Sequence, residues 1–190
     1  MTTHVEDAAT LAGLVIDGDV ETGGAASYPV TNPARPNEIV LEAPSTSPEQ
    51  LDRAVAAARR AQAAWAARAM EDRAATVLAA AEAGVAFVEA NELARLLTRE
   101  HGKTHLEAIF DTATMAGMAA AFAPVVAEAL AGRTASGGAT RVEWVPQGVV
   151  AAILPFIWPV SVMANKILPA ALRPWRPPPT ARWPGRWVGP

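Results

Sequence analysis

The chain has 190 residues, of which 51% are hydrophobic and 18% are charged, and its formal net charge is −3. This composition excludes an intrinsically disordered chain, which needs low hydrophobicity and high net charge. It also argues against a nucleic-acid partner, because phosphate neutralisation requires an excess of Lys and Arg. The absence of cysteine excludes a disulfide framework, a Cys-ligated metal and a thiolate nucleophile within these residues.

The two ends of the chain differ in composition from the rest. Residues 1–11 lack the basic and apolar regions of a secretory signal, so we expect a disordered N-terminus and a cytoplasmic protein. Residues 173–190 hold six of the 16 prolines, three of the six tryptophans, four arginines and no acid. Such a proline density prevents regular helix and sheet. The tail is a proline-rich docking segment, a basic and aromatic contact for nucleic acid or a membrane, or, as we favour, the product of out-of-frame translation of a GC-rich gene.

The first third of the chain predicts hairpins followed by a helix. Asp17-Gly18 lies between apolar residues within 14–20, which indicates a tight β-hairpin, and 28–33 with 39–41 indicate further extended chain. Ser47, followed by proline and by Gln50, predicts a capped helix start. Helical spacing then gives that helix one mostly apolar face, opposite a solvated arginine face: Leu51, Val55, Ala58, Gln62 and Trp65.

Three helices are predicted in the middle of the chain. The first covers 71–89, with Val77, Leu78, Ala81, Val85 and Val88 pointing inward. The second covers 92–101, with Asn91 as its N-cap and Gly102 at its end. The third begins near Thr104, and we expect Pro124 to kink or divide it.

After a predicted loop at 132–138, the sequence predicts two strands and a last helix. Residues 140–145 alternate between polar and apolar side chains. Residues 149–154 are continuously apolar, which is typical of a strand buried on both faces of a parallel sheet. Residues 144–165 are uncharged and long enough to test as a membrane span. Three prolines interrupt this stretch, so strand, turn and a helix at 159–172 are favoured and no membrane is expected.

Composition and spacing point to no metal site. His101 and His105 have the four-residue spacing that places two imidazoles on one helix face, but Gly102 falls between them where a helix ends. No third residue stands at a spacing that would make it a further metal ligand. The residues alone therefore predict an α/β domain with one face of a parallel sheet, and no specific function.

An ordered set of segments carries the interpretation further. Asn32-Pro33, 51–58, 97–103, 148–159 and 166–170 occur in an order that resembles the N-terminal part of an NAD(P)-dependent aldehyde dehydrogenase. The resemblance covers 12–172 and not the tail. It implies an incomplete aldehyde-dehydrogenase-like α/β fold, with an N-terminal hairpin, helices and the start of a Rossmann-like parallel sheet, as one partial cofactor-binding domain.

The resemblance also implies site residues. In that family a cysteine thiolate attacks the aldehyde, an asparagine amide holds the oxyanion, hydride passes to the nicotinamide, and a glutamate activates water. By resemblance, Ile153, Leu154, Pro155 and Phe156 contact NAD or NADP. Ile157 stands where the family has its oxyanion asparagine. Isoleucine donates no hydrogen bond, and losing one such donor typically costs about 2.7–4 kcal/mol.

The expected function follows from that resemblance and from its departures. The family oxidises an aldehyde to an acid, but the nucleophilic cysteine and the general-base glutamate are not in this chain, so we expect it to be inactive alone. One alternative is a non-catalytic subunit that pairs with a full-length relative through 140–146. Another is an unrelated helical module whose tail docks a partner. The strand 149–154 would lack neighbours, which leaves an apolar edge open.

Overall fold

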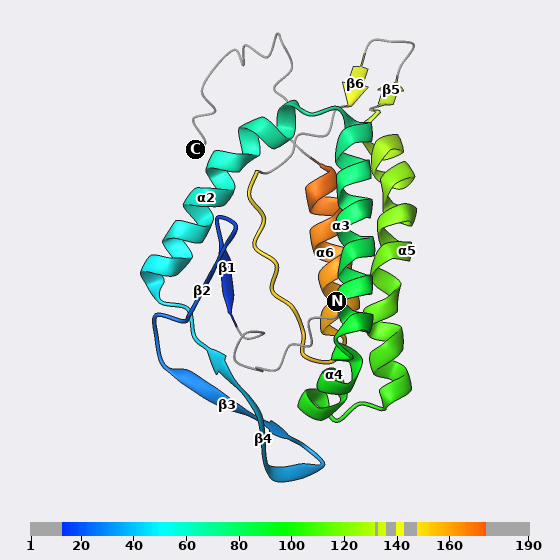
Figure 1. The fold of residues 1–190 in the computed structure, drawn as a ribbon. Coiled ribbons are helices and arrows are strands. Elements are labelled where there is room, and N and C mark those ends of the chain that lie inside the picture. The colour runs from blue at the N-terminus through cyan, green and yellow to red at the C-terminus, as the bar shows by residue number, and fades with distance from the viewer. Residues whose placement is uncertain (1–12, 132, 136–139, 143–147, 174–190) are drawn as a thin grey trace, which may run out of the picture.

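A layer of three packed helices holds the hydrophobic core (Figure 1). The computed structural model describes residues 13–131, 133–135, 140–142 and 148–173. The three helices are α3 (Met70–Ala90), α5 (His105–Leu130) and α6 (Pro159–Leu172). Their contacting faces bury Val77, Ala81, Ala119, Val126, Ala164, Leu168 and Leu172. The short helix α4 (Leu93–His101) packs at one end of this layer, against α5.

The strands form three separate antiparallel pairs. β1 (Leu14–Ile16) pairs with β2 (Asp19–Glu21), β3 (Ser27–Asn32) with β4 (Arg35–Pro44), and β5 (Arg133–Ala135) with β6 (Thr140–Val142). The first pair confirms the predicted hairpin: its turn residues Asp17 and Gly18 have φ of 55° and 91°, as a tight two-residue hairpin turn requires.

The helix α2 (Pro48–Ala67) begins as predicted but is less buried than predicted. Its capping box is complete, because Gln50 N donates to Ser47 Oγ at 3.2 Å and Ser47 N donates to Gln50 Oε1 at 3.1 Å. The predicted apolar face is partly wrong, since Leu51 is 59% exposed. The reason is that α2 lies apart from the three-helix layer (Figure 1). It reaches that layer through Trp65, whose Nε1 donates to Ala171 O at 2.7 Å.

The structure confirms the predicted end of α4 and corrects the predictions for Asn91 and Pro124. Gly102 ends α4 with φ of 72°, but Asn91 is the C-cap of α3, and α4 follows from Glu92 with no side-chain cap. Pro124 does not divide α5, which is continuous. A proline removes one backbone hydrogen bond, and the packing of α5 along α3 and α6 holds the helix across it.

Two predictions about the region after α5 are wrong. Residues 133–135 form β5 rather than loop, and 149–154 form no strand. A buried parallel strand exists only when neighbouring strands satisfy its backbone groups. The sheets that the structure describes are all antiparallel pairs, and none includes this run. The predicted strand 140–145 is observed as β6 over its first three residues; 143–147 lie outside the described residues, as do 1–12 and 174–190.

In the described part of the chain, α5 has the length and hydropathy to cross a membrane, and α3 with α4 pass the same test only if their 78° bend is counted within one span. The stretch suggested by the sequence, 144–165, includes irregular chain at 149–155 and the start of α6. α5 packs against α3, α4 and α6, and 11% of its apolar 18-residue window is buried. The absence of a membrane partner stays a prediction.

Candidate functional site

The four residues predicted to contact a cofactor lie on an exposed run that leads into α6. Ile153 is 92% exposed and Phe156 is 76% exposed, and Leu154 and Pro155 between them are exposed as well. The run therefore presents apolar side chains to the outside rather than burying them in a sheet. These four residues are consecutive in the sequence, so they lie close together without any packing between separate elements.

The turn after this run closes one wall of a cavity at the end of α4. This cavity measures about 260 Å³. Its lining residues come from the α4–α5 junction and from the turn: His101, Gly102, Lys103, Glu107, Phe156, Ile157 and Trp158. Ile157, the residue at the predicted oxyanion position, is 57% exposed there. Its side chain offers no hydrogen-bond donor to this cavity.

A buried ion pair fixes the turn and the start of α6. Lys103 Nζ lies 2.9 Å from Asp111 Oδ2, and the Asp111 side chain is fully buried. The other carboxylate oxygen, Oδ1, accepts a hydrogen bond from Ser161 N at 2.8 Å. Ser161 N is one of the backbone donors that a helix leaves unpaired in its first turn. Asp111 of α5 thus caps α6 from another helix, where a negative charge also complements the helix dipole.

The Lys103 ammonium group holds the turn from its other side. Its Nζ lies 4.6 Å from the ring centroid of Trp158, the N-cap of α6. Burial opposes ionisation of the Asp111 carboxyl, but the hydrogen bonds from Lys103 and Ser161 outweigh it, so the pKa of Asp111 lies below its usual value. The Asp111 carboxyl is therefore ionised near neutral pH, and its pair with Lys103 contacts the turn on both sides of Ile157.

His101 borders the same cavity as a neutral imidazole near pH 7. Its ring centroid lies 6.4 Å from that of Phe156. Burial and, next, the charge of Lys103 lower the pKa of His101, and a hydrogen bond with the Phe156 backbone only partly offsets them. Its Nδ1 is buried without a hydrogen-bond partner in the described part of the chain.

We expect stability to fall as the pH drops through the ordinary pKa of His101, 6.5, toward its lower pKa in the folded chain. Its pKa is lower in the folded chain than in the unfolded chain, so the unfolded chain binds more protons as the pH falls. Urea unfolding at several pH values measures this slope, and His101→Gln should flatten it. His105→Gln, outside this cavity, is the matched control. An unchanged slope in His101→Gln would contradict the assignment.

Sequence reasoning missed the residues that hold this site. Lys103, Asp111 and Ser161 come from the α4–α5 junction, the second turn of α5 and the first turn of α6. One signal was available: Asp111 is a lone acid within a long apolar helical segment, and such a carboxylate, if buried, must find a cation or donors. The sequence gives no means of choosing Ser161 as the second partner.

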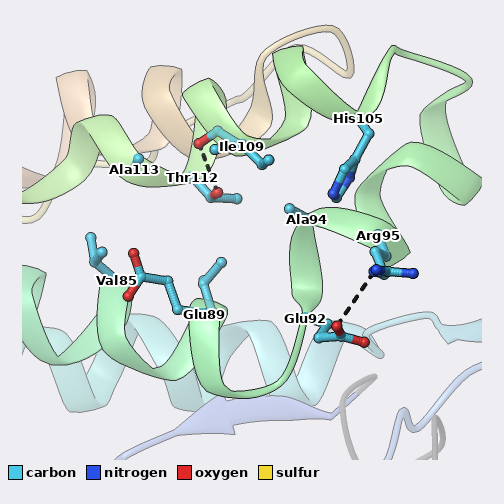
Figure 2. Close-up of a pocket in the computed structure, with 10 residues that line it drawn as sticks. Val85, Glu89, Glu92, Ala94, Arg95, His105, Ile109, Thr112 and Ala113 are labelled. Atoms are coloured by element: carbon cyan, nitrogen blue, oxygen red, sulfur yellow. Dashed lines mark hydrogen bonds and ion pairs between the residues drawn. The ribbon is translucent and has the colours of Figure 1, made fainter.

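A second cavity lies between α3, α4 and α5 (Figure 2). It measures about 300 Å³ and combines apolar residues such as Val85 and Ile109 with Glu89, Arg95 and His105. Figure 2 shows the His105 ring pointing toward α4, above Ala94 and Arg95. His101 and His105 thus line different cavities. Among the described residues, no three His, Cys, Asp or Glu side chains gather in a way that could hold a metal ion.

Comparison with known sequences identifies the family. Residues 20–173 match the aldehyde dehydrogenase family. The chain belongs to this family. Its fold, with mixed helices and small sheets, is that of an aldehyde dehydrogenase N-terminal part.

Curated aldehyde dehydrogenases are similar over most of this chain but are much longer. The 3,6-anhydro-alpha-L-galactose dehydrogenase of Streptomyces coelicolor is 40% identical over 151 residues, which cover 77% of this chain and 30% of that protein. The N-succinylglutamate 5-semialdehyde dehydrogenase of Chromobacterium violaceum is 34% identical over 165 residues, covering 85% and 33%. This chain thus spans about a third of the length of these relatives.

Solved aldehyde dehydrogenase structures superpose on the same part. The NADP-dependent glyceraldehyde-3-phosphate dehydrogenase of Bacillus halodurans, solved with NADP, has a TM-score of 0.74 at 27% identity, covering 85% of this chain and 35% of its own. The NAD-dependent benzaldehyde dehydrogenase of Corynebacterium glutamicum has a TM-score of 0.73 at 26% identity, covering 90% and 37%.

Proposed function

We propose that this chain forms the N-terminal, cofactor-side part of an enzyme that oxidises an aldehyde to a carboxylic acid with NAD⁺ or NADP⁺. The observation that carries the proposal is the family match over residues 20–173, which contains the whole run 149–157. Solved relatives described as NADP-dependent and NAD-dependent support both cofactors. We place the protein in the cytoplasm.

In the proposed enzyme, Ile153, Leu154, Pro155 and Phe156 contact the nicotinamide cofactor. Their exposed apolar side chains fit this role, because they offer an accessible surface on which rings can pack. A nicotinamide cofactor held there would supply the hydride acceptor. The residues of this chain would orient it and exclude water from one side, while the Lys103–Asp111 pair holds the adjoining turn in place.

The chain alone is proposed to be catalytically inactive, for two chemical reasons. Its 190 residues contain no cysteine, so no thiolate of this chain attacks an aldehyde carbon. At the turn, Ile157 offers no side-chain donor to a developing oxyanion, although donors of that kind typically contribute about 2.7–4 kcal/mol.

We expect no aldehyde-dependent formation of NADH or NADPH by the purified chain. The assay follows absorbance of the reduced nicotinamide with each cofactor and a panel of aldehydes that includes benzaldehyde and glyceraldehyde 3-phosphate. The Corynebacterium glutamicum benzaldehyde dehydrogenase serves as the positive control. Turnover that follows this chain through successive purification steps would contradict the proposal.

An alternative is a non-catalytic subunit that pairs with a full-length relative through 140–146. The hairpin of β5 and β6 favours it, because this hairpin stands at the end of α5, beyond the three-helix layer (Figure 1). Its predicted partner is a complete aldehyde dehydrogenase.

A further inference from the structure

The cavity between α3, α4 and α5 combines aliphatic walls with charged groups at its edge (Figure 2). Its volume of about 300 Å³ lies at the lower end of the range for small-molecule sites. Figure 2 shows Val85 and Glu89 rising from α3 toward α5, where Ile109, Thr112 and Ala113 face them. A molecule that enters between these two helices therefore meets aliphatic side chains and a carboxylate.

The aliphatic walls favour a ligand with an apolar body. Val85 and Val88 of α3 and Ile109 of α5 contribute branched side chains, and Ala94 and Ala113 leave room between them. Ile109 is 43% exposed, so a ligand would cover apolar surface that is open to water. Covering such surface is favourable in proportion to its area.

Glu89 is the lining carboxylate whose charge is not neutralised. At the rim of the cavity Arg95 Nε lies 3.4 Å from Glu92 Oε1, so these two charges answer each other. No ion pair or hydrogen bond involves the Glu89 carboxylate in the described part of the chain. The Thr112 hydroxyl is also occupied, because it donates within its own helix to Ala108 O at 3.0 Å. Two glutamates and one arginine thus leave one negative charge in excess, at Glu89.

The position of Glu89 within α3 adds to the negative potential. Glu89 lies in the last turn of this helix, which ends at Ala90. Backbone carbonyl groups give that end of a helix a partial negative charge, which a cation stabilises. The last turn of α3 contains no basic residue. A cation in the cavity would therefore be attracted by both the carboxylate and the helix end.

Other classes of ligand fit this cavity less well. A phosphate or carboxylate group needs a free cationic donor, whereas Arg95 already pairs with Glu92. His105 stands at the α4 side, above Ala94 and Arg95 (Figure 2). Among the described residues no three side chains gather in a way that could hold a metal ion. An organic cation is the class that both the walls and the charge favour.

We propose that this cavity binds a small organic ammonium ion that carries an apolar body. The ammonium group lies at Glu89, and the body lies between Val85 and Ile109. The inference does not rest on the proposed dehydrogenase function, because the cavity shares no residue with the run 149–157. The site is also separate from the cofactor contacts proposed for 153–156.

The probe is phenethylammonium, with phenethyl alcohol as its neutral analogue and hydrocinnamate as its anionic analogue. Titration of the isotope-labelled chain, followed by NMR, measures each dissociation constant and locates the site through its amide shifts. We expect the ammonium ion to bind with a Kd on the order of 1 mM, which is ordinary for so small a ligand. It should bind at least about threefold more tightly than either analogue, the gain typical of a partly exposed ion pair.

Two substitutions separate the effect of the charge from that of the walls. Glu89→Gln keeps the shape of the side chain and should lower the affinity for phenethylammonium about threefold, to that of the alcohol. Glu128→Gln is the matched control, because Glu128 is also an exposed acid in the last turn of a helix, here α5, and lies outside the cavity. Ala113→Leu fills the cavity and should weaken binding of all three probes. Ala120→Leu, also exposed on α5 but outside the cavity, should not.

Each remaining outcome decides against the proposal. Equal binding of the three probes would show that the cavity does not select charge, and tighter binding of hydrocinnamate would assign recognition to Arg95 instead. Unchanged affinity in Glu89→Gln, amide shifts far from the cavity, or no binding well above the expected Kd would overturn the site itself. The aldehyde assay described above bears on the proposed function alone, so the two proposals fail separately.

Discussion

We expect Asp111→Ala to lower the free energy of unfolding by about 3–5 kcal/mol, which is typical when one partner of a buried ion pair is removed. The substitution leaves the Lys103 ammonium group, whose side chain is only 10% exposed, without its counter-ion. It also removes the acceptor of Ser161 N at the first turn of α6. Urea unfolding followed by circular dichroism measures the loss.

Asp17→Asn is the control, because Asp17 pairs with Arg60 in an exposed ion pair and Asn tolerates the positive φ of this turn residue. Such pairs contribute about 0–1 kcal/mol, so the two aspartates should differ clearly. The pKa of Asp111 is lowered in the folded chain, so its stabilisation is present above the unfolded pKa and is lost as the pH falls through the folded pKa. Asp111→Ala should therefore weaken the acid dependence of unfolding. Equal effects of the two substitutions would contradict a structural role for the buried pair.

The second large effect is expected for Leu172→Ala, at about 2–5 kcal/mol of unfolding free energy. Leu172 ends α6 and is fully buried in the three-helix core. Truncation of its side chain leaves a cavity. Trp65, which packs against the same core, does not move in to fill it, because its hydrogen bond to Ala171 O holds it in place. The same urea titration measures the change.

Ile167→Ala provides the comparison on the same helix, because Ile167 is 47% exposed. Its truncation removes less buried surface and should cost well under half as much. If both variants lost equal stability, the end of α6 would not be part of the core. If neither variant changed the midpoint, cooperative packing of α3, α5 and α6 would be contradicted.

Much of the local structure could be predicted because its causes lie within a few residues. The Asp17-Gly18 turn, the capping box of Ser47 and Gln50, and the left-handed Gly102 are each decided by side chains and backbone preferences over one turn. The ordered segments also identified the family, which the match over 20–173 confirms.

The strand prediction at 149–154 was wrong for a reason that local sequence does not contain. Continuous apolar residues favour a strand buried on both faces, but a strand forms only when neighbours satisfy its backbone. Composition described the residues correctly, but no strand in the described part of the chain lies beside them to satisfy their backbone groups. The roles predicted for Ile153, Leu154, Pro155 and Phe156 in cofactor contact stay predictions.

The sequence by itself determined the family and most of the helix positions, and the absence of cysteine and the isoleucine at position 157 are readable from the residues alone. Only the tertiary structure decided how the site is held. Asp111 meets Ser161 across 50 residues and meets Lys103 across a helix junction. Hydrogen bonds and ion pairs of this kind depend on which surfaces pack together, and packing is settled by the whole core rather than by any short segment.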